Sequence, residues 1–238
     1  MTLIADIIHD ITANPAPVLF LDTCILLDIV RAPLRNKPSE IQFARLFLTA
    51  LQKTPKTIHL LVASPTQREW TDHIAETEDD CTIAVNSCNA VASICGHMEL
   101  PPVAFLPAGV LTLSTLLRNL SADLLAATVS MDHDAAALGR AVDRIIASTH
   151  PAKPGGKGAK DSVILEHAVE ATTQLRNAGF TGICLFVSSN TKDFANAGST
   201  NLHAQLTSAF NDVNLEYAVS LTHAESILTA AGWVPRQT

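Results

Sequence analysis

The sequence lacks a hydrophobic run long enough to cross a membrane as a helix, because no stretch of about 18 apolar residues occurs in it. Its most apolar region, residues 100–117, is interrupted by Pro101, Pro102 and Pro107. The first residues, MTLIADIIHD, also lack the basic start and long apolar core of a secretory signal peptide. We therefore expect a cytoplasmic protein with no membrane-spanning segment.

Closely spaced cysteines are missing as well, since none of the five cysteines belongs to a C-x-x-C motif. Cys81, Cys88 and Cys95 recur at every seventh position and would share one face of a helix. Either they bind a zinc ion, or they are small side chains buried in the core. The second interpretation is favoured, because cysteines that bind zinc usually occur in closer pairs.

Several catalytic motifs do not occur. The glycine-rich stretch PGGKGAKDS does not match the phosphate-binding pattern G-x-x-x-x-G-K-[ST] and does not directly follow an expected strand. The G-x-S-x-G motif of serine hydrolases is absent. Asp22 is not followed two residues later by the second aspartate of haloacid-dehalogenase-like phosphatases. These absences disfavour a P-loop protein, a serine hydrolase and a phosphatase of that type.

Positive charge is scarce, because 16 Lys and Arg residues stand against 23 Asp and Glu residues and give a net charge of −7. This balance disfavours indiscriminate binding to polyanions, although a local basic patch is enough to contact a nucleic acid. Such a patch contains Arg140, Arg144, His150, Lys153, Lys157 and Lys160. It is either a solvated surface segment or a contact for phosphate groups.

The sequence does contain short apolar runs separated by helical patterns, and hydrophobic residues make up 47% of its 238 positions. Four runs predict buried strands, at residues 18–21, 58–62, 183–187 and 215–219. Helices are predicted at residues 1–14, 23–31, 40–53, from 65 into the 90s with a break near 78–80, 160–177 and from 222 onward. Residues 100–150 are expected to be wholly helical after a proline-rich start, with a flexible loop over 149–160.

Short apolar strands that alternate with helices predict a three-layer α/β/α fold with a mostly parallel central sheet of four to five strands. No internal repeat or change of composition divides the chain, so residues 1–238 are expected to form one domain with a helical insertion at about 70–150. Helix starts are predicted from three capping pairs, which are Ser39 with Gln42, Ser64 with Gln67, and Thr222 with Glu225.

Acidic residues are expected to gather at one edge of this sheet. Ligands of parallel sheets bind beyond the carboxyl ends of the strands. Asp22 ends the first strand, Glu69 follows the second, and Asp193 follows the third, while Asp161 begins the helix before the third strand. Carboxylates that lie together repel one another, and a site of this kind usually holds a cation. Oxygen ligands suit Mg²⁺ or Mn²⁺, and two such ions about 4 Å apart can promote phosphodiester cleavage.

Each of these acidic residues also has a purely structural interpretation. Asp22 could cap the first helix after the strand, and Glu69 could be a solvated helix residue. Asp161 is placed to interact favourably with a helix dipole, and Asp193 suits a turn. Only their joint placement favours a site.

Four segments in this order resemble the motifs of PIN-domain nucleases over residues 17–196. LFLDTCILLDIV is similar to the opening strand of that family, SPTQREW to its second motif, KGAKDSVILEHAV to its third, and FVSSNTKDFAN to its closing strand and loop. The resemblance implies a PIN-like fold and a metal-dependent endonuclease that cuts RNA. Its carboxylate ligands would be Asp22, Glu69 and Asp161, with Mg²⁺ or Mn²⁺ as the cofactor.

The fourth motif departs from the family pattern. Thr191 stands where the family often has an acidic residue, and Asp193 lies two positions further on. Asp193, Ser189 or Asn190 is therefore left to complete the metal site. Substrate contacts are expected from Thr23, Ser189, Asn190, Thr191, Lys157 and Lys160. The sequence leaves open a protein regulator, a homo-oligomer, and a degenerate module that binds RNA or a protein partner without cutting.

Overall fold

A five-stranded parallel sheet forms the centre of the protein in the computed structural model, which describes residues 2–98, 113–196 and 199–234. The strand order is β3-β2-β1-β4-β5, and every neighbouring pair is parallel. The strands are β1 (Val18–Leu21), β2 (His59–Ala63), β3 (Val129–Met131), β4 (Cys184–Val187) and β5 (Glu216–Ala218). The α/β fold with a parallel sheet is confirmed.

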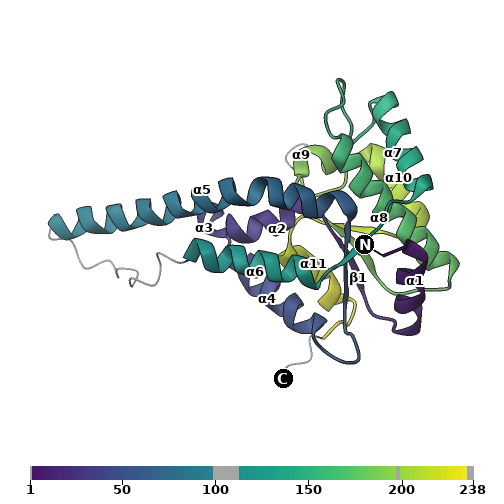
Figure 1. Ribbon diagram of the computed structural model, residues 1–238, viewed down its shortest axis with the longest axis horizontal. Coiled ribbons are helices and arrows are strands. Elements are labelled where there is room, and N and C mark those ends of the chain that lie inside the picture. The colour runs from purple at the N-terminus through teal and green to yellow at the C-terminus, as the bar shows by residue number, and fades with distance from the viewer. Residues whose placement is uncertain (1, 99–112, 197–198, 235–238) are drawn as a thin grey trace.

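Helices cover both faces of the sheet, as Figure 1 shows. The central strands are buried on both sides because successive side chains of a strand point to opposite faces. In β1, Val18 and Phe20 join one hydrophobic cluster, and Leu19 and Leu21 join the other. The first cluster is completed by α1 (Ile4–Ala13), α8 (Ala159–Asn177) and α10 (Ala204–Val213). The second is completed by α2 (Thr23–Val30), α4 (Pro38–Leu51), α6 (Leu113–Ala127) and α11 (Leu221–Ala230).

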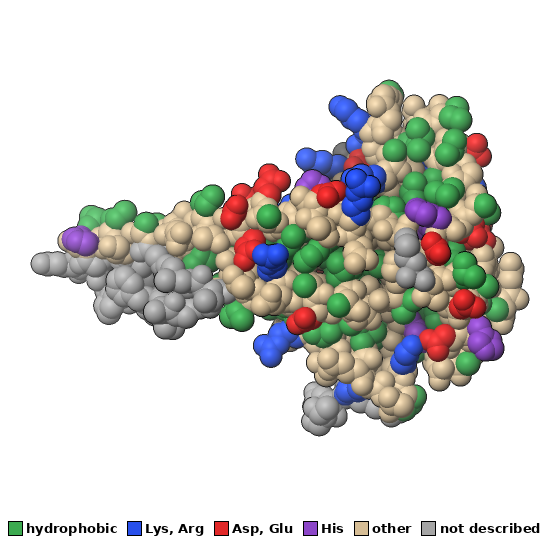
Figure 2. Space-filling model, in the orientation of Figure 1, with side chains coloured by type: hydrophobic (Ala, Val, Ile, Leu, Met, Phe, Trp, Pro, Cys, Tyr) green, Lys and Arg blue, Asp and Glu red, His purple; other side chains and the backbone are tan. Residues whose placement is uncertain are grey.

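The helix α5 (Ser64–His97) is continuous over 34 residues and projects well beyond the sheet (Figure 1). The break predicted near 78–80 does not occur, because Ile74, Cys81 and Val85 pack on α2 and α6 along one uninterrupted face. Of the three spaced cysteines only Cys81 is buried, since Cys88 is exposed and Cys95 is half-buried. The interpretation of all three as buried side chains is therefore wrong for Cys88 and Cys95. Figure 2 shows hydrophobic side chains along the outer part of this helix. The large exposed hydrophobic residues of α5 include Ile83, Val91 and Ile94.

The segment 113–150 is not wholly helical, which corrects the prediction for residues 100–150. Between α6 and α7 (Ala135–Ala147) the chain forms β3, which pairs with β2 at the edge of the sheet. The strand has only three residues, too few to show the alternation that distinguishes a strand from a helix. The insertion therefore contributes a strand to the sheet. The proline-rich start of this region lies outside the described residues.

The three predicted helix caps are wrong. Helix α5 begins at Ser64 itself, and the Ser64 hydroxyl contacts His133. Helix α4 begins at Pro38, so Ser39 lies inside it. At α11 the cap is Ser220, whose hydroxyl accepts from the His223 backbone N–H, while Thr222 donates to the buried Glu40. Several Ser and Thr positions are equally suitable as caps in the sequence, and tertiary contacts decide which of them caps the helix.

The short helices α3 (Ala32–Arg35) and α9 (Thr191–Phe194) complete the fold. No helix in the described part of the chain is long and apolar enough to span a membrane.

Candidate active site at the carboxyl edge of the sheet

The strand order changes direction between β1 and β4. From β1 the chain adds β2 and then β3 on one side, and it returns to the other side of β1 to add β4 and β5. Connections on the two sides diverge at such a switch point, where parallel sheets commonly bind their ligands. Asp22 follows β1 directly, and residues 188–193 follow β4. The predicted acidic residues after these two strands therefore meet at this edge of the sheet.

Asp22 is 3% exposed and is held by two side chains, one from α2 and one from the residue after β4. Its Oδ2 accepts hydrogen bonds from Ser188 Oγ at 2.6 Å and from Cys24 Sγ at 3.1 Å. Burial raises the pKa of Asp22, and the charge of Glu69 adds to the effect, while the hydrogen bonds act against it. The carboxyl group makes no capping hydrogen bond to α2, so a purely capping role does not account for it.

Glu69 reaches the same edge from the second turn of α5. Thr23 Oγ1 donates to Glu69 Oε2 at 2.7 Å, which connects the start of α2 with α5. Thr23 is itself buried. Its hydroxyl thus holds Glu69 in position. Because Thr23 is buried, it has no exposed group for the substrate contact that was predicted for it.

Asp161 and Asp193 are joined by one amide. Asn190 Nδ2 donates to Asp161 Oδ1 at 3.2 Å and to Asp193 Oδ2 at 2.8 Å. The pKa of Asp161 is raised to about 7, first by burial and then by the charges of Asp22, Asp193 and Glu69. All four predicted carboxyl groups therefore lie near enough for their charges to interact. Asn190, predicted as a substrate contact, positions two of them.

The loop before α8 brings a cation to this cluster. Lys153 forms an ion pair with Asp193. The loop is folded back on itself by a bridge between Lys153 and Lys157. It needs glycine at position 158, where φ is +77° and a Cβ atom would lie 2.3 Å from the Pro151 carbonyl oxygen. Asp193 is thereby partly neutralised within the chain.

In the rest of the predicted basic patch, His150 stacks on His203, and the other four residues form two groups. Arg140 and Arg144 form ion pairs with Glu166, which is 2% exposed, and Arg140 also pairs with Glu170. Lys157 and Lys160 are exposed and have no ion pair with another residue of the described ranges. The two arginines thus join α7 to α8, and the two lysines stay open to solvent.

Sequence reasoning missed Ser188 and Cys24, which hold Asp22. Ser188 is fully buried, and its Oγ also accepts from the Asn190 backbone N–H at 3.2 Å. Cys24 Sγ accepts from the backbone N–H of Ser189, and burial raises the pKa of the Cys24 thiol. Ser188 follows β4 as Asp22 follows β1, a signal that could have identified it. Ser189 is fixed through its backbone, and Thr191 begins α9.

The donor set suits a hard cation. Side-chain hydrogen bonds engage Asp22 Oδ2, Glu69 Oε2 and Asp161 Oδ1, and no side chain of the described ranges donates to their second oxygens. No three His, Cys, Asp or Glu side chains of those ranges are arranged to hold an ion together. Mg²⁺ usually keeps several waters and is bound through one or two carboxylates, so this arrangement fits a hydrated ion. It does not show the direct coordination by several carboxylates that two bridged ions would need.

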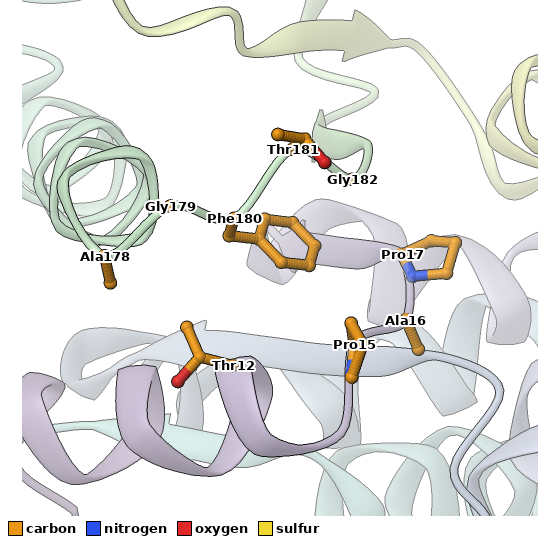
Figure 3. A pocket seen from close by; sticks show the side chains of 9 residues that line it. All are labelled: Thr12, Pro15, Ala16, Pro17, Ala178, Gly179, Phe180, Thr181 and Gly182. Atoms are coloured by element: carbon orange, nitrogen blue, oxygen red, sulfur yellow. The ribbon is translucent and has the colours of Figure 1, made fainter.

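Two hollows lie at opposite ends of the sheet. A cleft of about 480 Å³ adjoins the acidic cluster and includes Glu69 and Lys160 in its lining. A pocket of about 440 Å³ lies at the amino ends of β1 and β4, between the end of α1 and the turn after α8 (Figure 3). Its lining contains Thr12, Phe180 and Thr181 among Pro, Ala and Gly residues, and no titratable side chain. Only the first hollow can take part in acid, base or metal chemistry.

No family model matches the chain, and neither a curated protein nor a solved structure matches it.

Proposed function

We propose that this chain is a metal-dependent endoribonuclease of the PIN-like type, which hydrolyses RNA phosphodiester bonds with Mg²⁺ or Mn²⁺. The observation that carries the proposal is the meeting of Asp22, Glu69, Asp161 and Asp193 at the switch point of a parallel sheet. They come from four separate helices or helix starts and are linked through Thr23 and Asn190. Collecting like charges in this way is unfavourable unless a cation offsets them.

The protein's own residues would position the reacting groups. Ser188 and Cys24 fix Asp22, Thr23 fixes Glu69, and Asn190 fixes Asp161, so each carboxylate keeps one oxygen free for a hydrated ion. A bound Mg²⁺ or Mn²⁺ would lower the pKa of a coordinated water and offset charge on the phosphate group. The exposed Lys157 and Lys160 would attract the RNA backbone toward an otherwise acidic edge.

The resemblance of four ordered segments to PIN-domain motifs supports RNA as the substrate. A specific observation favours a second candidate, which is a degenerate module that binds RNA or a protein without cutting. Lys153 already pairs with Asp193, the residue proposed to replace the acidic group that is missing at Thr191. An internal ion pair of this kind would reduce the charge available for a second cation.

The test is cleavage of a labelled single-stranded RNA by the purified chain with Mn²⁺ or Mg²⁺. Asp22→Asn and Asp161→Asn are expected to lower the rate about 10³-fold or more, because metal-ion catalysis contributes several kcal/mol. Asp123→Asn is the matched control, since Asp123 is exposed on α6, which leads to the amino end of β3. Undiminished cleavage by both site variants, or cleavage insensitive to EDTA, would refute the proposal. RNA binding without cleavage by the wild-type chain would favour the second candidate.

A further inference from the structure

The cleft beside the acidic cluster lies beyond the carboxyl ends of β2 and β3. One wall is the first two turns of α5, and the other is formed by the residues after β3 and by the start of α8. It is lined by Ser64, Pro65, Arg68, Glu69, Asp72, His133 and Lys160. Glu69 belongs to both the cleft and the acidic cluster, so a ligand in the cleft would extend directly from the proposed site of cleavage.

The cleft contains two cations that are free to bind an anion. Arg68 and Lys160 are exposed, and neither forms an ion pair with another residue in the described part of the chain. Each immediately precedes a member of the acidic cluster, Arg68 before Glu69 and Lys160 before Asp161. They are therefore suited to bind a phosphate group that lies next to that cluster.

The two acidic residues of the cleft do not cancel this charge. Glu69 accepts a hydrogen bond from Thr23, which turns one of its oxygens toward α2. Asp72 is exposed to solvent, where water screens its charge. A phosphate next to Arg68 and Lys160 therefore meets cations nearby and acids that are partly engaged or screened.

His133 supplies an aromatic surface in the same cleft. Its exposed ring lies 3.1 Å from Ser64 Oγ, and its centroid lies 5.9 Å from that of His167 in an edge-on arrangement. The buried His167 accepts from the Asp134 backbone N–H through Nε2, so it donates through Nδ1 to the Val163 carbonyl and is neutral. His133 is thus held by a hydroxyl group and a neutral ring, and exposed histidine rings of this kind can stack on unpaired bases.

We propose that this cleft is a nucleotide subsite for single-stranded RNA, with a phosphate bound by Arg68 and Lys160 and the adjoining base placed against His133. The choice of RNA rests on the proposed function. A volume of about 480 Å³ lies within the range of about 300–1,000 Å³ typical of small-ligand sites. The subsite holds the nucleotide next to the scissile phosphate on the β2 and β3 side, and it selects single strands because a paired base cannot reach the His133 ring.

Binding without cleavage tests this subsite. A fluorescently labelled, unstructured RNA is titrated with the full chain in EDTA, with Asp161→Asn as the common background. Removing both cations, in Arg68→Ala with Lys160→Ala, is expected to weaken binding at least tenfold and to flatten the slope of log K against log salt by about 1.4, at about 0.7 for each lost single-strand contact. Arg45→Ala is the matched control, because Arg45 is exposed on α4 and lies outside the cleft.

The aromatic role has its own variants. His133→Ala is expected to weaken binding roughly 5- to 150-fold with an unchanged salt slope, as for the loss of one stacked base. His133→Phe keeps an aromatic face and is expected to retain most of the affinity. Thermal unfolding of each variant checks that it is folded.

Failure of the subsite can be told apart from failure of the nuclease. If the charge and His133→Ala variants bind RNA as the background chain does, the subsite is overturned even where the wild-type chain cleaves RNA. A background chain that binds no RNA also overturns it. If the variants lose binding as expected but the wild-type chain never cleaves, the subsite stands and only the nuclease proposal fails.

Discussion

The two edges of the same sheet are built in opposite ways. At the amino edge, Arg176 lies at the end of α8 and donates to the backbone carbonyls of Phe180, Gly182, Val213 and Asn214. The pocket beside it has no titratable lining residue. At the carboxyl edge, burial and mutual repulsion raise the pKa of Asp22 and of Asp161. The central strands β1, β2 and β4 are buried along their whole length. The difference between the two edges therefore lies in the residues that precede and follow these strands.

This contrast indicates where stability and function are placed in the molecule. The amino edge satisfies its polar groups and contributes to stability. The carboxyl edge keeps carboxylates close together, which costs stability in the absence of a cation. Locally unfavourable arrangements of this kind are expected at functional sites. Variants at each edge test whether stability depends mainly on the amino edge and activity on the carboxyl edge.

The largest expected effect on stability is at the amino edge. Arg176→Met keeps the aliphatic part of the side chain but removes its hydrogen bonds to the carbonyls of the α8–β4 and α10–β5 turns. We expect a loss of roughly 2–4 kcal/mol in the free energy of unfolding, because several partly buried carbonyl groups lose a charged donor together. Urea unfolding measures it. The cleavage rate per folded molecule should stay at the wild-type value, and a lost rate with unchanged stability would contradict the division between the edges.

The next effect is expected at Asn190, which joins Asp161 to Asp193. Asn190→Ala should lower activity about 10- to 100-fold and raise the Mn²⁺ concentration needed for half-maximal cleavage, as other losses of groups that orient metal ligands do. Asn211→Ala, at an exposed position on α10, is the control. Wild-type metal dependence in Asn190→Ala would show that the amide does not position the carboxylates.

The smallest of the three effects is a gain in stability at the carboxyl edge. Folding raises the pKa of Asp161 from an ordinary value of 3.8 to about 7. Between these values the folded state binds more protons than the unfolded state, so stability falls as pH rises from about 4 to about 7 and stays low above that. Asp161→Asn removes this loss. It should match the wild-type chain at about pH 4 and exceed it by roughly 1–2 kcal/mol at about pH 8. This is less than the full 1.36 kcal/mol for each unit of pKa shift, because solvent screens the partly exposed carboxyl group.

Urea unfolding without metal at these two pH values measures the gain. Asp123→Asn is again the control for the loss of one surface charge. If Asp161→Asn is no more stable than the wild-type chain at about pH 8, Asp161 does not carry the repulsion that the geometry indicates.

Much of the fold follows from local sequence patterns. The apolar runs before Asp22 and Ser188 are short and bounded by polar residues, and they form β1 and β4 close to the predicted limits. The strand β3 could not be predicted, because Val129, Ser130 and Met131 are too few to show a period and are fixed by pairing with β2. The continuity of α5 past residue 80 also depends on tertiary packing, through Cys81 and Val85.

The acidic residues of the site were predictable because each follows a strand directly or lies in the first two turns of a helix. Their supporting contacts were not. The bond from Thr23 to Glu69 joins residues 46 positions apart, and the bond from Ser188 to Asp22 joins residues 166 apart. Such contacts depend on strand order, which local patterns do not specify. For the same reason, the pairing of Lys153 with Asp193 could not be read from their sequence positions.

The most direct test of the account is whether a divalent cation stabilises the chain through the acidic cluster. Thermal unfolding is followed at about pH 8 while Mn²⁺ is added to the wild-type chain, to Asp161→Asn and to Asp123→Asn. The wild-type chain and Asp123→Asn should gain about 2.7 kcal/mol at an ion concentration 100 times the dissociation constant, and Asp161→Asn should gain much less. No Mn²⁺-dependent gain in the wild-type chain, or an equal gain in Asp161→Asn, would contradict a cation site at the carboxyl edge.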